Sequence, residues 1–488
     1  MSGYAQEAAF ARSREAFTQA EQWLAGVEAA GLEHAVLEKE LEARGRELER
    51  RLLQAHLDLR AAREQRREQV TGPDGVTRGR AERGCTRPLS SVFGPVTVTR
   101  IAYRAPGARN VHPADAELNM PPGRHSHGLS EKVAVAAARG SFGQACADIT
   151  GQTGCKLGTR QCQQLVRAAA ADFGDFYASR RRLPGAPGDV LVLQCDGKGI
   201  MVRPGELRPR SAELARKSVP KQDGRLSRGE VRTRKRMAEV GAVFDLTPVP
   251  RTPGDILGPG PRPPGPQAAG KWLTASVAAD AADVVAAVFA EADRRDPGYQ
   301  RTWIALADGN KDQIRWIRAQ AAARGITITI VVDFIHVIEY LWDAAWCLFP
   351  EASPDAGPWV RDSAAAILDG RAAGVAAALH DAAAGLTAAN RKTAARTARY
   401  LDAKAPWLNY PQALAAGWPI STGVIEGACR HLVKDRMAIT GARWGVQTAE
   451  AILQLRALHT NGDFDEYWTY HLHREHQRNH QTSYQLAA

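Results

Sequence analysis

The segment Val190–Gly199 (VLVLQCDGKG) constrains the fold of this chain more than any other. Val190 to Gln194 form a run of apolar or near-apolar residues without alternating polar positions, which is typical of a strand buried on both faces. The run leads to Asp196, and the Asp-Gly pair that follows can start a tight turn. A buried strand that ends in an acid is costly unless something compensates the charge. Asp196 therefore either has a partner elsewhere in the chain or only caps a β-turn.

The composition favours a soluble globular protein with a polyanionic partner. The 488 residues are 44% hydrophobic and 24% charged, as in ordinary globular chains. The net charge of +11 favours a partner such as a nucleic acid. No apolar run approaches the roughly 20 residues that span a bilayer. The seven cysteines are scattered without a C-x-x-C pair, so we expect a cytoplasmic protein without a disulfide framework or a cysteine zinc site.

The first 75 residues predict helices. Tyr4–Gly26 and Leu32–Arg67 both have helical patterns, and the second has leucines at a rough seven-residue spacing: Leu41, Leu48, Leu52 and Leu59. About three heptads are marginal for a coiled coil, so a helical hairpin and a dimer contact fit equally well. Residues 85–128 predict a β-hairpin and a loop, because Val92–Tyr103 alternates around a Gly-Pro break.

Residues 129–180 predict three short helices: Ser130–Arg139, Ser141–Gly151 and Gly158–Phe173. The last helix presents polar side chains near its start that could read bases: Arg160, Gln161, Gln164 and Arg167. The pattern over Ser141–Phe173 resembles a helix-turn-helix DNA-binding domain. An ordinary three-helix cluster with a polar surface is the alternative.

Residues 188–335 contain most of the predicted strands. After Asp196 we expect, in order, the strands Gly199–Val202 and Met237–Thr247, a Pro/Gly-rich loop Pro248–Gly270, the helix Asp280–Arg295, the strand Trp303–Ala307, the helix Lys311–Arg324 and the strand Ile326–Val332. The Trp303 strand ends at Asp308, and the last strand ends at Asp333. This order is compatible with an α/β ribonuclease H-like core with a mixed five-stranded sheet.

In that topology the first strand is central and the fourth lies beside it in parallel. Asp196 and Asp308 would then meet at one edge of the sheet. Residues 336–420 predict an all-α block rich in alanine, and residues 421–488 the closing helix of the core with further C-terminal helices.

A third carboxylate, Glu426, lies early in the predicted helix Gly423–Met437. Three acids at one site repel, since a pair about 4 Å apart costs about 4 kcal/mol at an effective dielectric near 20. They would hold either protons or divalent cations, and oxygen ligands favour Mg²⁺ or Mn²⁺. Two such ions can activate a water or a 3′-hydroxyl and stabilise the leaving oxygen of a phosphodiester. Asp196, Asp308 and Glu426 are therefore the predicted catalytic and metal-binding residues.

Asp333 is the alternative to Asp308 as the second catalytic acid. However, the strand that ends at Asp333 lies one strand further from the Asp196 strand. We expect Asp333 and His336 to form an auxiliary pair. Taken alone, each of these acids could also be a turn cap or a charge on a helix surface.

The segment Arg203–Arg236 carries twelve Lys or Arg residues against four acids. It is either a solvated loop or a clamp for backbone phosphates. The clamp would include Arg232, Arg234, Lys235 and Arg236.

At the C-terminus, His476 and His480 are four residues apart and could share a helix face for a metal. The polar surroundings favour a solvated tail instead.

Several stretches resemble insertion-sequence transposases of the ISKra type, which are related to the Mutator-like group. The stretches are VFGPVTVTRIAYRAPG, ARGSFGQACADITGQTGC, LQCDGKG, TWIALADGN, VVDFIHVIEYLW, TGVIEGACRHLVKDRMAITGARWG and NGDFDEYWTYHLHREHQRNH. The Glu426 segment followed by Arg443-Trp444 is the most specific.

The resemblance implies a DDE transposase that cuts DNA at the ends of its element and joins the freed 3′ ends to target DNA. Asp196, Asp308 and Glu426 match the DDE acids, and Asp333 with His336 match a D-x-x-H signature. The helical block 336–420 then corresponds to the all-α insertion domain that many such enzymes carry. The implied partners are the terminal inverted repeats and target DNA, with Arg443 among the DNA-binding residues. The resemblance also implies a dimer or larger assembly in the bacterial cytoplasm, associated with the nucleoid. A DNA-binding repressor without catalysis and a metal-dependent nuclease without strand transfer are the alternatives.

Overall fold

The computed structural model describes residues 8–181, 185–217, 235–261, 263–439 and 441–481. The chain divides into two compact units. Unit 1 comprises Met1–Ala178 and Gly462–Ala488, and unit 2 comprises Ser179–Asn461. No helix of the described ranges is both long and apolar enough to cross a membrane.

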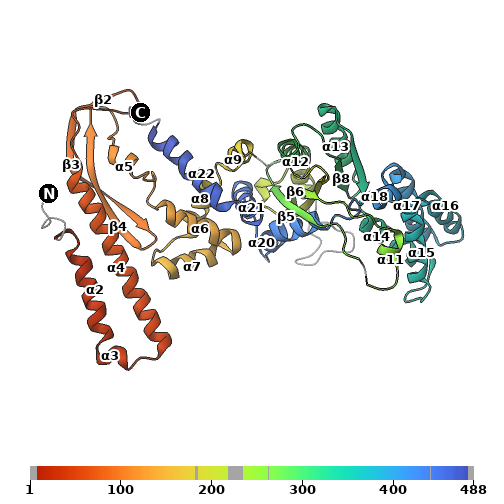
Figure 1. Cartoon of the computed structure of the whole chain (residues 1–488), viewed down its shortest axis with the longest axis horizontal. Coiled ribbons are helices and arrows are strands. Elements are labelled where there is room, and N and C mark those ends of the chain that lie inside the picture. The colour runs from red at the N-terminus through yellow and green to blue at the C-terminus, as the bar shows by residue number, and fades with distance from the viewer. Residues whose placement is uncertain (1–7, 182–184, 218–234, 262, 440, 482–488) are drawn as a thin grey trace. The chain divides into compact units, whose positions relative to one another are not determined.

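Unit 1 begins with a helical hairpin (Figure 1) made by α2 (Ala11–Leu24), α3 (Val27–Ala30) and α4 (His34–Arg63). The guanidinium of Arg44 lies 4.1 Å from the ring centre of Trp23, and Arg51 donates to the carbonyl of Arg12 over 3.1 Å. These contacts show the hairpin that was one of the two alternatives for this segment. The possible dimer contact stays a prediction.

A long β-hairpin packs beside α4 in unit 1, formed by β3 (Arg80–Ser91) and β4 (Gly94–Arg104). The short strands β1 (Val70–Thr71) and β2 (Thr77–Arg78) pair separately. A buried cluster joins α4 to the hairpin: Leu57, Leu89, Val96, Val98 and Met120. The prediction found the hairpin but misplaced its turn. Gly94-Pro95 begins the second strand, and the two residues before it form the turn.

Unit 1 also contains a three-helix cluster, α6 (His127–Arg139), α7 (Phe142–Thr153) and α8 (Thr159–Ala169). The hydroxyls of Ser126 and Ser141 cap the first two helices. Gly154 ends α7 in the left-handed region at φ 70°, which favours glycine. The three predicted helices are confirmed, but α6 begins at His127 instead of Ser130 and α8 ends at Ala169 instead of Phe173.

The C-terminal helix α22 (Phe464–His476) belongs to unit 1, together with α5 (Pro113–Glu117), α9 (Phe173–Ser179) and the π-helix η4 (Gln477–Gln481). Tyr467 donates to the carbonyl of Ala169 over 2.7 Å. His480 is only 4% exposed and lies 2.9 Å from the carbonyl of Met120. The expected solvated tail is therefore wrong at His480, because this side chain is buried in unit 1 against the Met120 carbonyl and the ring of His476.

Unit 2 is built on a five-stranded mixed sheet of β5 (Val190–Met201), β6 (Lys235–Leu246), β7 (Ala268–Ser276), β8 (Trp303–Ala307) and β9 (Ile328–Val332). The strand order is β7-β6-β5-β8-β9. The first three strands are antiparallel to one another, whereas β8 pairs in parallel with β5 and with β9. The predicted central strand and its parallel neighbour are confirmed.

Two strand predictions in unit 2 are wrong. The chain does not turn at Asp196, because β5 continues to Met201 and pairs with β6 along its whole length. What was expected as a returning strand, 199–202, is thus mostly the second half of β5. The third antiparallel strand is β7, which begins at the end of the expected Pro/Gly-rich loop.

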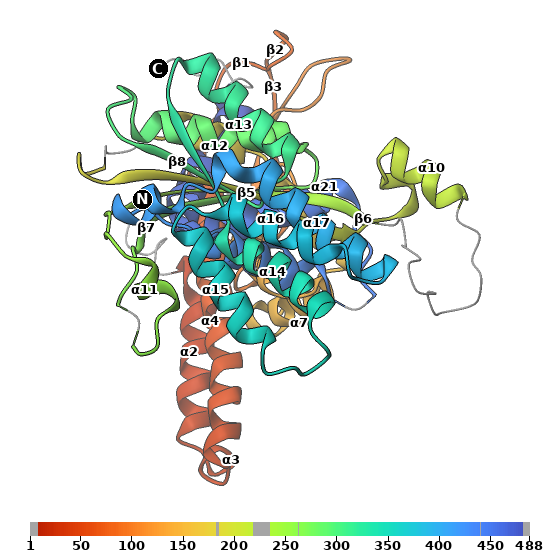
Figure 2. The ribbon, with the colours of Figure 1, turned by 90° about the vertical axis from the view of Figure 1, so that its right-hand side faces the viewer.

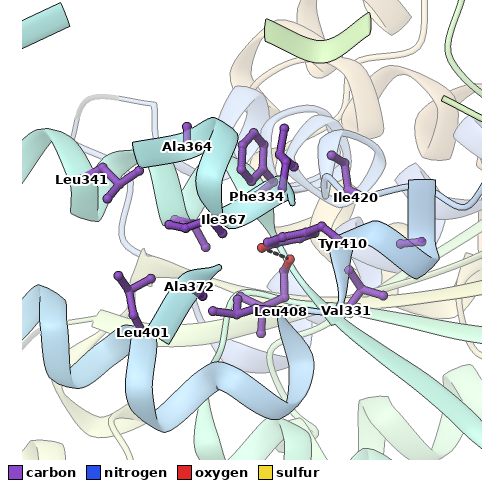
Figure 3. Packing of buried hydrophobic residues seen from close by; sticks show 14 of the residues in the cluster. Val331, Phe334, Leu341, Ala364, Ile367, Ala372, Leu401, Leu408, Tyr410 and Ile420 are labelled. Carbon is purple, nitrogen blue, oxygen red and sulfur yellow. Dashed lines mark hydrogen bonds between the residues drawn. The ribbon is translucent and has the colours of Figure 1, made fainter. Parts of the chain in front are cut away.

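Helices cover both faces of this sheet (Figure 2). One face carries α12 (Ala281–Arg295) and α13 (Lys311–Arg324). The other carries the expected helical insertion: α14 (Phe334–Leu348), α15 (Ala356–Leu368), α16 (Ala372–Ala383), α17 (Ala388–Lys404) and α18 (Tyr410–Ala415). Figure 3 shows the apolar cluster beneath the insertion, where the Tyr410 hydroxyl donates to the carbonyl of Val332 over 2.9 Å.

The end of unit 2 contains α19 (Gly423–Ala428), the π-helix η3 (Cys429–Lys434), α20 (Asp435–Met437) and α21 (Val446–Asn461). The predicted helix Gly423–Met437 is therefore interrupted by a π-helical turn. At the end of α21, the side chain of Asn461 accepts from the amide of Leu273 and donates to its carbonyl, over 2.8 and 2.9 Å. The short elements are η1 (Pro204–Glu206), α10 (Pro209–Lys217), α11 (Pro253–Leu257) and η2 (Ala405–Trp407).

A buried ion-pair network lies near the first residues of β5 and the last residues of β6. Asp245 contacts Arg295 and Arg301 over 2.8 and 2.7 Å. Arg295 also contacts Glu291, which is fully buried, over 2.9 Å. The network joins α12 to the sheet.

Candidate active site

Asp196 and Asp308 line one cavity of about 60 Å³ in unit 2. The last parallel pair between β5 and β8 joins Gln194 to Leu306. Each acid lies two residues beyond that pair, so the register brings both to the same edge of the sheet. The structure therefore brings these two predicted residues together.

The carboxylate of Asp196 is held from two sides. Its Oδ1 accepts from the amide of Gly197 over 2.6 Å. Its Oδ2 lies 3.3 Å from the Sγ atom of Cys429, the first residue of η3. Burial raises the pKa of the Cys429 thiol, and the charge of Asp196 adds to this shift, so the thiol keeps its proton and donates.

Asp308 begins the turn between β8 and α13. Its Oδ1 accepts from the amide of Asn310 over 2.8 Å. Gly309 has φ 90°, and a Cβ atom there would lie 3.0 Å from the Tyr400 hydroxyl and 3.3 Å from Cε of Lys404. Only glycine fits this turn without strain, because the backbone is left-handed and α17 approaches closely.

Glu426 does not line this cavity. It is exposed, in the first turn of α19. Its helix is anchored to the sheet, since the amide of Ile425 donates to Oε1 of Gln194 over 2.9 Å. Cys429, one turn further on, reaches Asp196. In the part of the chain that the structure describes, no three His, Cys, Asp or Glu residues are arranged to hold a metal ion.

Asp333 is 1% exposed. One carboxylate oxygen caps α14 by accepting from the amide of Ile335 over 3.1 Å, and the other accepts from the Thr422 hydroxyl over 2.7 Å. Thr422 also lies 3.4 Å from Glu426. His336 lies 3.3 Å from Glu339. Asp333 thus joins α14 to the segment before α19.

Sequence reasoning missed two residues that line the cavity, Glu239 and Gln313. Glu239 is paired with Gly197 across β5 and β6, and a Cβ atom on Gly197 would lie 2.8 Å from its carboxylate. Burial raises the pKa of Glu239, and the Asp196 charge adds to this while Arg208 opposes it. The register of β6 against β5 is the signal that could have found Glu239.

Gln313 is 8% exposed and donates from its Nε2 to the carbonyl of Cys195. Its Oε1 has no hydrogen-bond partner among the described residues. The lining of the cavity therefore includes three acids, Asp196, Glu239 and Asp308, together with apolar residues such as Val284 and Val285. Carboxylate oxygens are the donors that a hard divalent cation such as Mg²⁺ prefers, but Asp196, Glu239 and Asp308 are not arranged as a metal-binding group in this structure.

The predicted base-reading residues lie on α8 in unit 1. Cys162, Val166 and Ala169 are buried, so Arg160, Gln161, Gln164 and Arg167 are on the exposed side. Oε1 of Gln161 accepts from the amide of Gly158 over 3.0 Å, so this side chain caps its own helix.

The predicted phosphate clamp is described only in part. Arg232 and Arg234 lie outside the described residues. Lys235 is exposed, whereas Arg236 donates to the carbonyls of Val277, Glu206 and Ala278 and so fixes a loop. Arg443 is exposed, next to Trp444, whose amide donates to the carbonyl of Met201 over 3.0 Å.

No family model and no curated protein matches this chain. Among solved structures, the Drosophila P element transposase strand transfer complex aligns with 73% of this chain and 81% of its own chain. The aligned residues are 10% identical, and the TM-score is 0.23. A likeness at this level carries no argument about fold or function, so the functional argument starts from the residues of the site.

Proposed function

We propose that this chain is a ribonuclease H-like DNA transposase of the ISKra type. It would cut DNA at the ends of its element and transfer the 3′-hydroxyl ends to target DNA. The observation that supports this most is the position of Asp196 and Asp308, which lie two residues beyond one parallel strand pair and line one cavity. Paired carboxylates at the end of neighbouring parallel strands suit phosphodiester chemistry assisted by cations.

In this proposal Asp196 and Asp308 would hold Mg²⁺ or Mn²⁺. Glu426 lies outside their cavity in this structure and would have to move towards them to complete the set of ligands. Two ions, when bound, supply activation of the attacking oxygen and stabilisation of the leaving oxygen. The residues of the chain orient these carboxylates. Cys429 and the amide of Gly197 fix Asp196, the Asn310 amide fixes Asp308, and Gln194 anchors the helix of Glu426.

DNA would bind through several surfaces. The exposed side of α8 would read the terminal inverted repeats in a helix-turn-helix manner. Arg232, Arg234, Lys235 and Arg443 would contact backbone phosphates, which the net charge of +11 supports. Arg236 is less suited, because its guanidinium already binds three carbonyls. Pairing two element ends would require a dimer or a larger assembly.

The test is Mg²⁺-dependent cleavage of DNA that carries the inverted repeats flanking the gene. Asp196→Asn, Asp308→Asn and Glu426→Gln should each abolish cleavage and leave binding of the ends largely intact. Asp312→Asn is the matched control, because this exposed acid on α13 pairs with Arg315. Joining of pre-cleaved ends to target DNA supports a transposase. Hydrolysis without joining would indicate a nuclease, and binding without cleavage a repressor.

A further inference from the structure

A second site in unit 2 lies between α13 and the segment where α17 continues into η2. It is a groove of about 420 Å³, within the range of volumes that small-molecule sites have. Four cationic side chains and one tryptophan contribute to its lining: Lys311, Arg315, Arg318, Lys404 and Trp407. None of the described residues that line it is acidic.

Lys404 is the least exposed cation of this groove. It is 4% exposed, and its Nζ lies 5.6 Å from the ring centre of Trp407. Among the described residues its ammonium group forms no hydrogen bond and no ion pair within 4 Å. Burial and the charge of Lys311 lower the pKa of Lys404, and the charge of Asp308 opposes this shift. An anion bound in the groove would further favour the charged form of this ammonium group.

The other cations form a row along α13. Lys311, Arg315 and Arg318 are exposed and follow the spacing of one helix face. Seven residues of helix span about 10 Å, so the row suits a chain of phosphates better than a single small anion. Arg315 also pairs with Asp312 over 3.1 Å, whereas Lys311 and Arg318 form no ion pair among the described residues.

The groove lies beside the candidate active site. Cε of Lys404 is 3.3 Å from the position that a Cβ atom on Gly309 would take, and Gly309 follows Asp308 directly. An aromatic ring next to cations is the arrangement that binds unpaired nucleotides, because the base stacks and the cations follow the backbone.

We infer that this groove binds an unpaired nucleotide segment of a DNA strand, with phosphates at Lys311, Arg318 and Lys404 and a base against the exposed part of Trp407. The inference deepens the proposed function, because it gives the strand that leaves the active site a path across α13. Binding itself does not depend on cleavage.

The test is binding of a labelled oligothymidine to the full chain in EDTA, measured by fluorescence anisotropy at several salt concentrations. The variant Lys311→Gln/Arg318→Gln changes exposed side chains and should fold normally. It should make the negative slope of log K, the logarithm of the binding constant, against log salt shallower by about 1.4. Each phosphate contact on a single strand contributes about 0.7, and the variant removes two. Trp407→Ala should weaken binding roughly 5- to 150-fold. Lys404→Gln should also weaken it, and thermal unfolding shows whether that variant folds.

Arg371→Gln and Trp346→Ala are matched controls, because both residues are exposed on the helical insertion. The inference is overturned if the wild type does not bind, if the groove variants bind like the controls, or if the controls lose as much affinity. A chain that cleaves but shows no effect of the groove variants retains the proposed function and loses this inference. A chain with the expected binding losses but no cleavage retains the groove and loses the proposed function.

Discussion

The Sγ atom of Cys429 lies 3.3 Å from Oδ2 of Asp196, although the two residues are 233 positions apart in the chain. The contact joins the π-helix η3 to the central strand at the point where that strand carries its acid. π-Helical turns occur frequently at functional sites. Here the turn gives Asp196 a hydrogen-bond donor that keeps its proton.

Cys429→Ala should therefore slow DNA cleavage about fivefold, because a typical hydrogen bond contributes about 1 kcal/mol. Binding of the element ends should not change. Cys429→Ser keeps a donor and should restore most of the rate, which single-turnover cleavage measures. Cys347→Ala is the control thiol, since Cys347 donates to the Asp343 carbonyl on α14. Equal cleavage rates for the alanine variant and the wild type would show that Cys429 does not position Asp196.

Glu239→Gln should raise the Mg²⁺ concentration needed for half-maximal cleavage about tenfold, the lower end for residues that support metal ligands. Glu239 lines the cavity with Asp196 and Asp308, so its charge would attract the cation. A metal titration of the cleavage rate measures this. Glu213→Gln, on α10, is the control, and an unchanged titration curve for Glu239→Gln would contradict the prediction.

Gln164→Ala should weaken binding to element ends about 5- to 150-fold relative to random DNA, as expected for loss of a base contact. Gln161→Ala should instead lower the stability of unit 1 by about 1 kcal/mol, because Gln161 caps its own helix. Competition binding and urea unfolding separate the two effects. Equal loss of specificity in both variants would show that Gln161 also reads bases.

Asp245→Ala should lower the free energy of unfolding of unit 2 by about 3 kcal/mol, the lower end of the cost of removing one partner of a buried ion pair, because Arg301 loses this carboxylate whereas Arg295 keeps Glu291. Arg295 and Arg301, which pair with Asp245, are each 4% exposed. Urea unfolding measures the change. Asp369→Ala removes an exposed pair with Arg371 and should cost less than about 1 kcal/mol. Similar losses in both variants would contradict the prediction.

The stability of unit 1 should depend on Asp172 at low pH. Burial alone would raise the pKa of Asp172, but hydrogen bonds from Arg478 and His471 outweigh it and hold the pKa below its ordinary value. Because the folded-state pKa is the lower one, the stabilisation is complete above the unfolded pKa of about 3.9. It should be lost as the pH falls from there through the folded pKa.

Unfolding of Asp172→Asn followed between pH 2 and 7 tests this. The variant should be less stable at pH 7 and should lack this part of the acid dependence. Asp175→Asn is the control, because Asp175 is exposed and pairs only at the surface with Arg474. An acid dependence identical to that of the wild type would show that Asp172 does not titrate in this range.

The sequence predicted the relationship between Asp196 and Asp308 because parallel strands leave their ends at one edge of a sheet. It failed for β7 (Ala268–Ser276), because Pro and Gly residues before this strand indicated a loop. The Asp196-Gly197 pair was misread as a turn, since its local preference is weaker than pairing with β6 over the full strand. Glu239 was missed for the same reason, because its place at the cavity depends on the pairing of β6 with β5.

The sequence predicted that Glu426 lies on a helix, but it did not predict how that helix packs against the sheet. Its distance from the cavity depends on how α19 docks on β5, which no local pattern encodes. The burial of His480 was missed for a related reason, because its partners lie some 360 residues earlier in the chain.

Asn461 has a consequence for how copies of this chain can assemble. Its side-chain amide occupies both main-chain groups of Leu273 on the outer strand of the sheet, as a neighbouring strand would. The unpaired edge of an outer strand can pair with a strand of a second molecule. Here the side chain of Asn461 already occupies the main-chain groups in the middle of the β7 edge. Copies that meet around two DNA ends would have to associate through surfaces other than a sheet continued across β7.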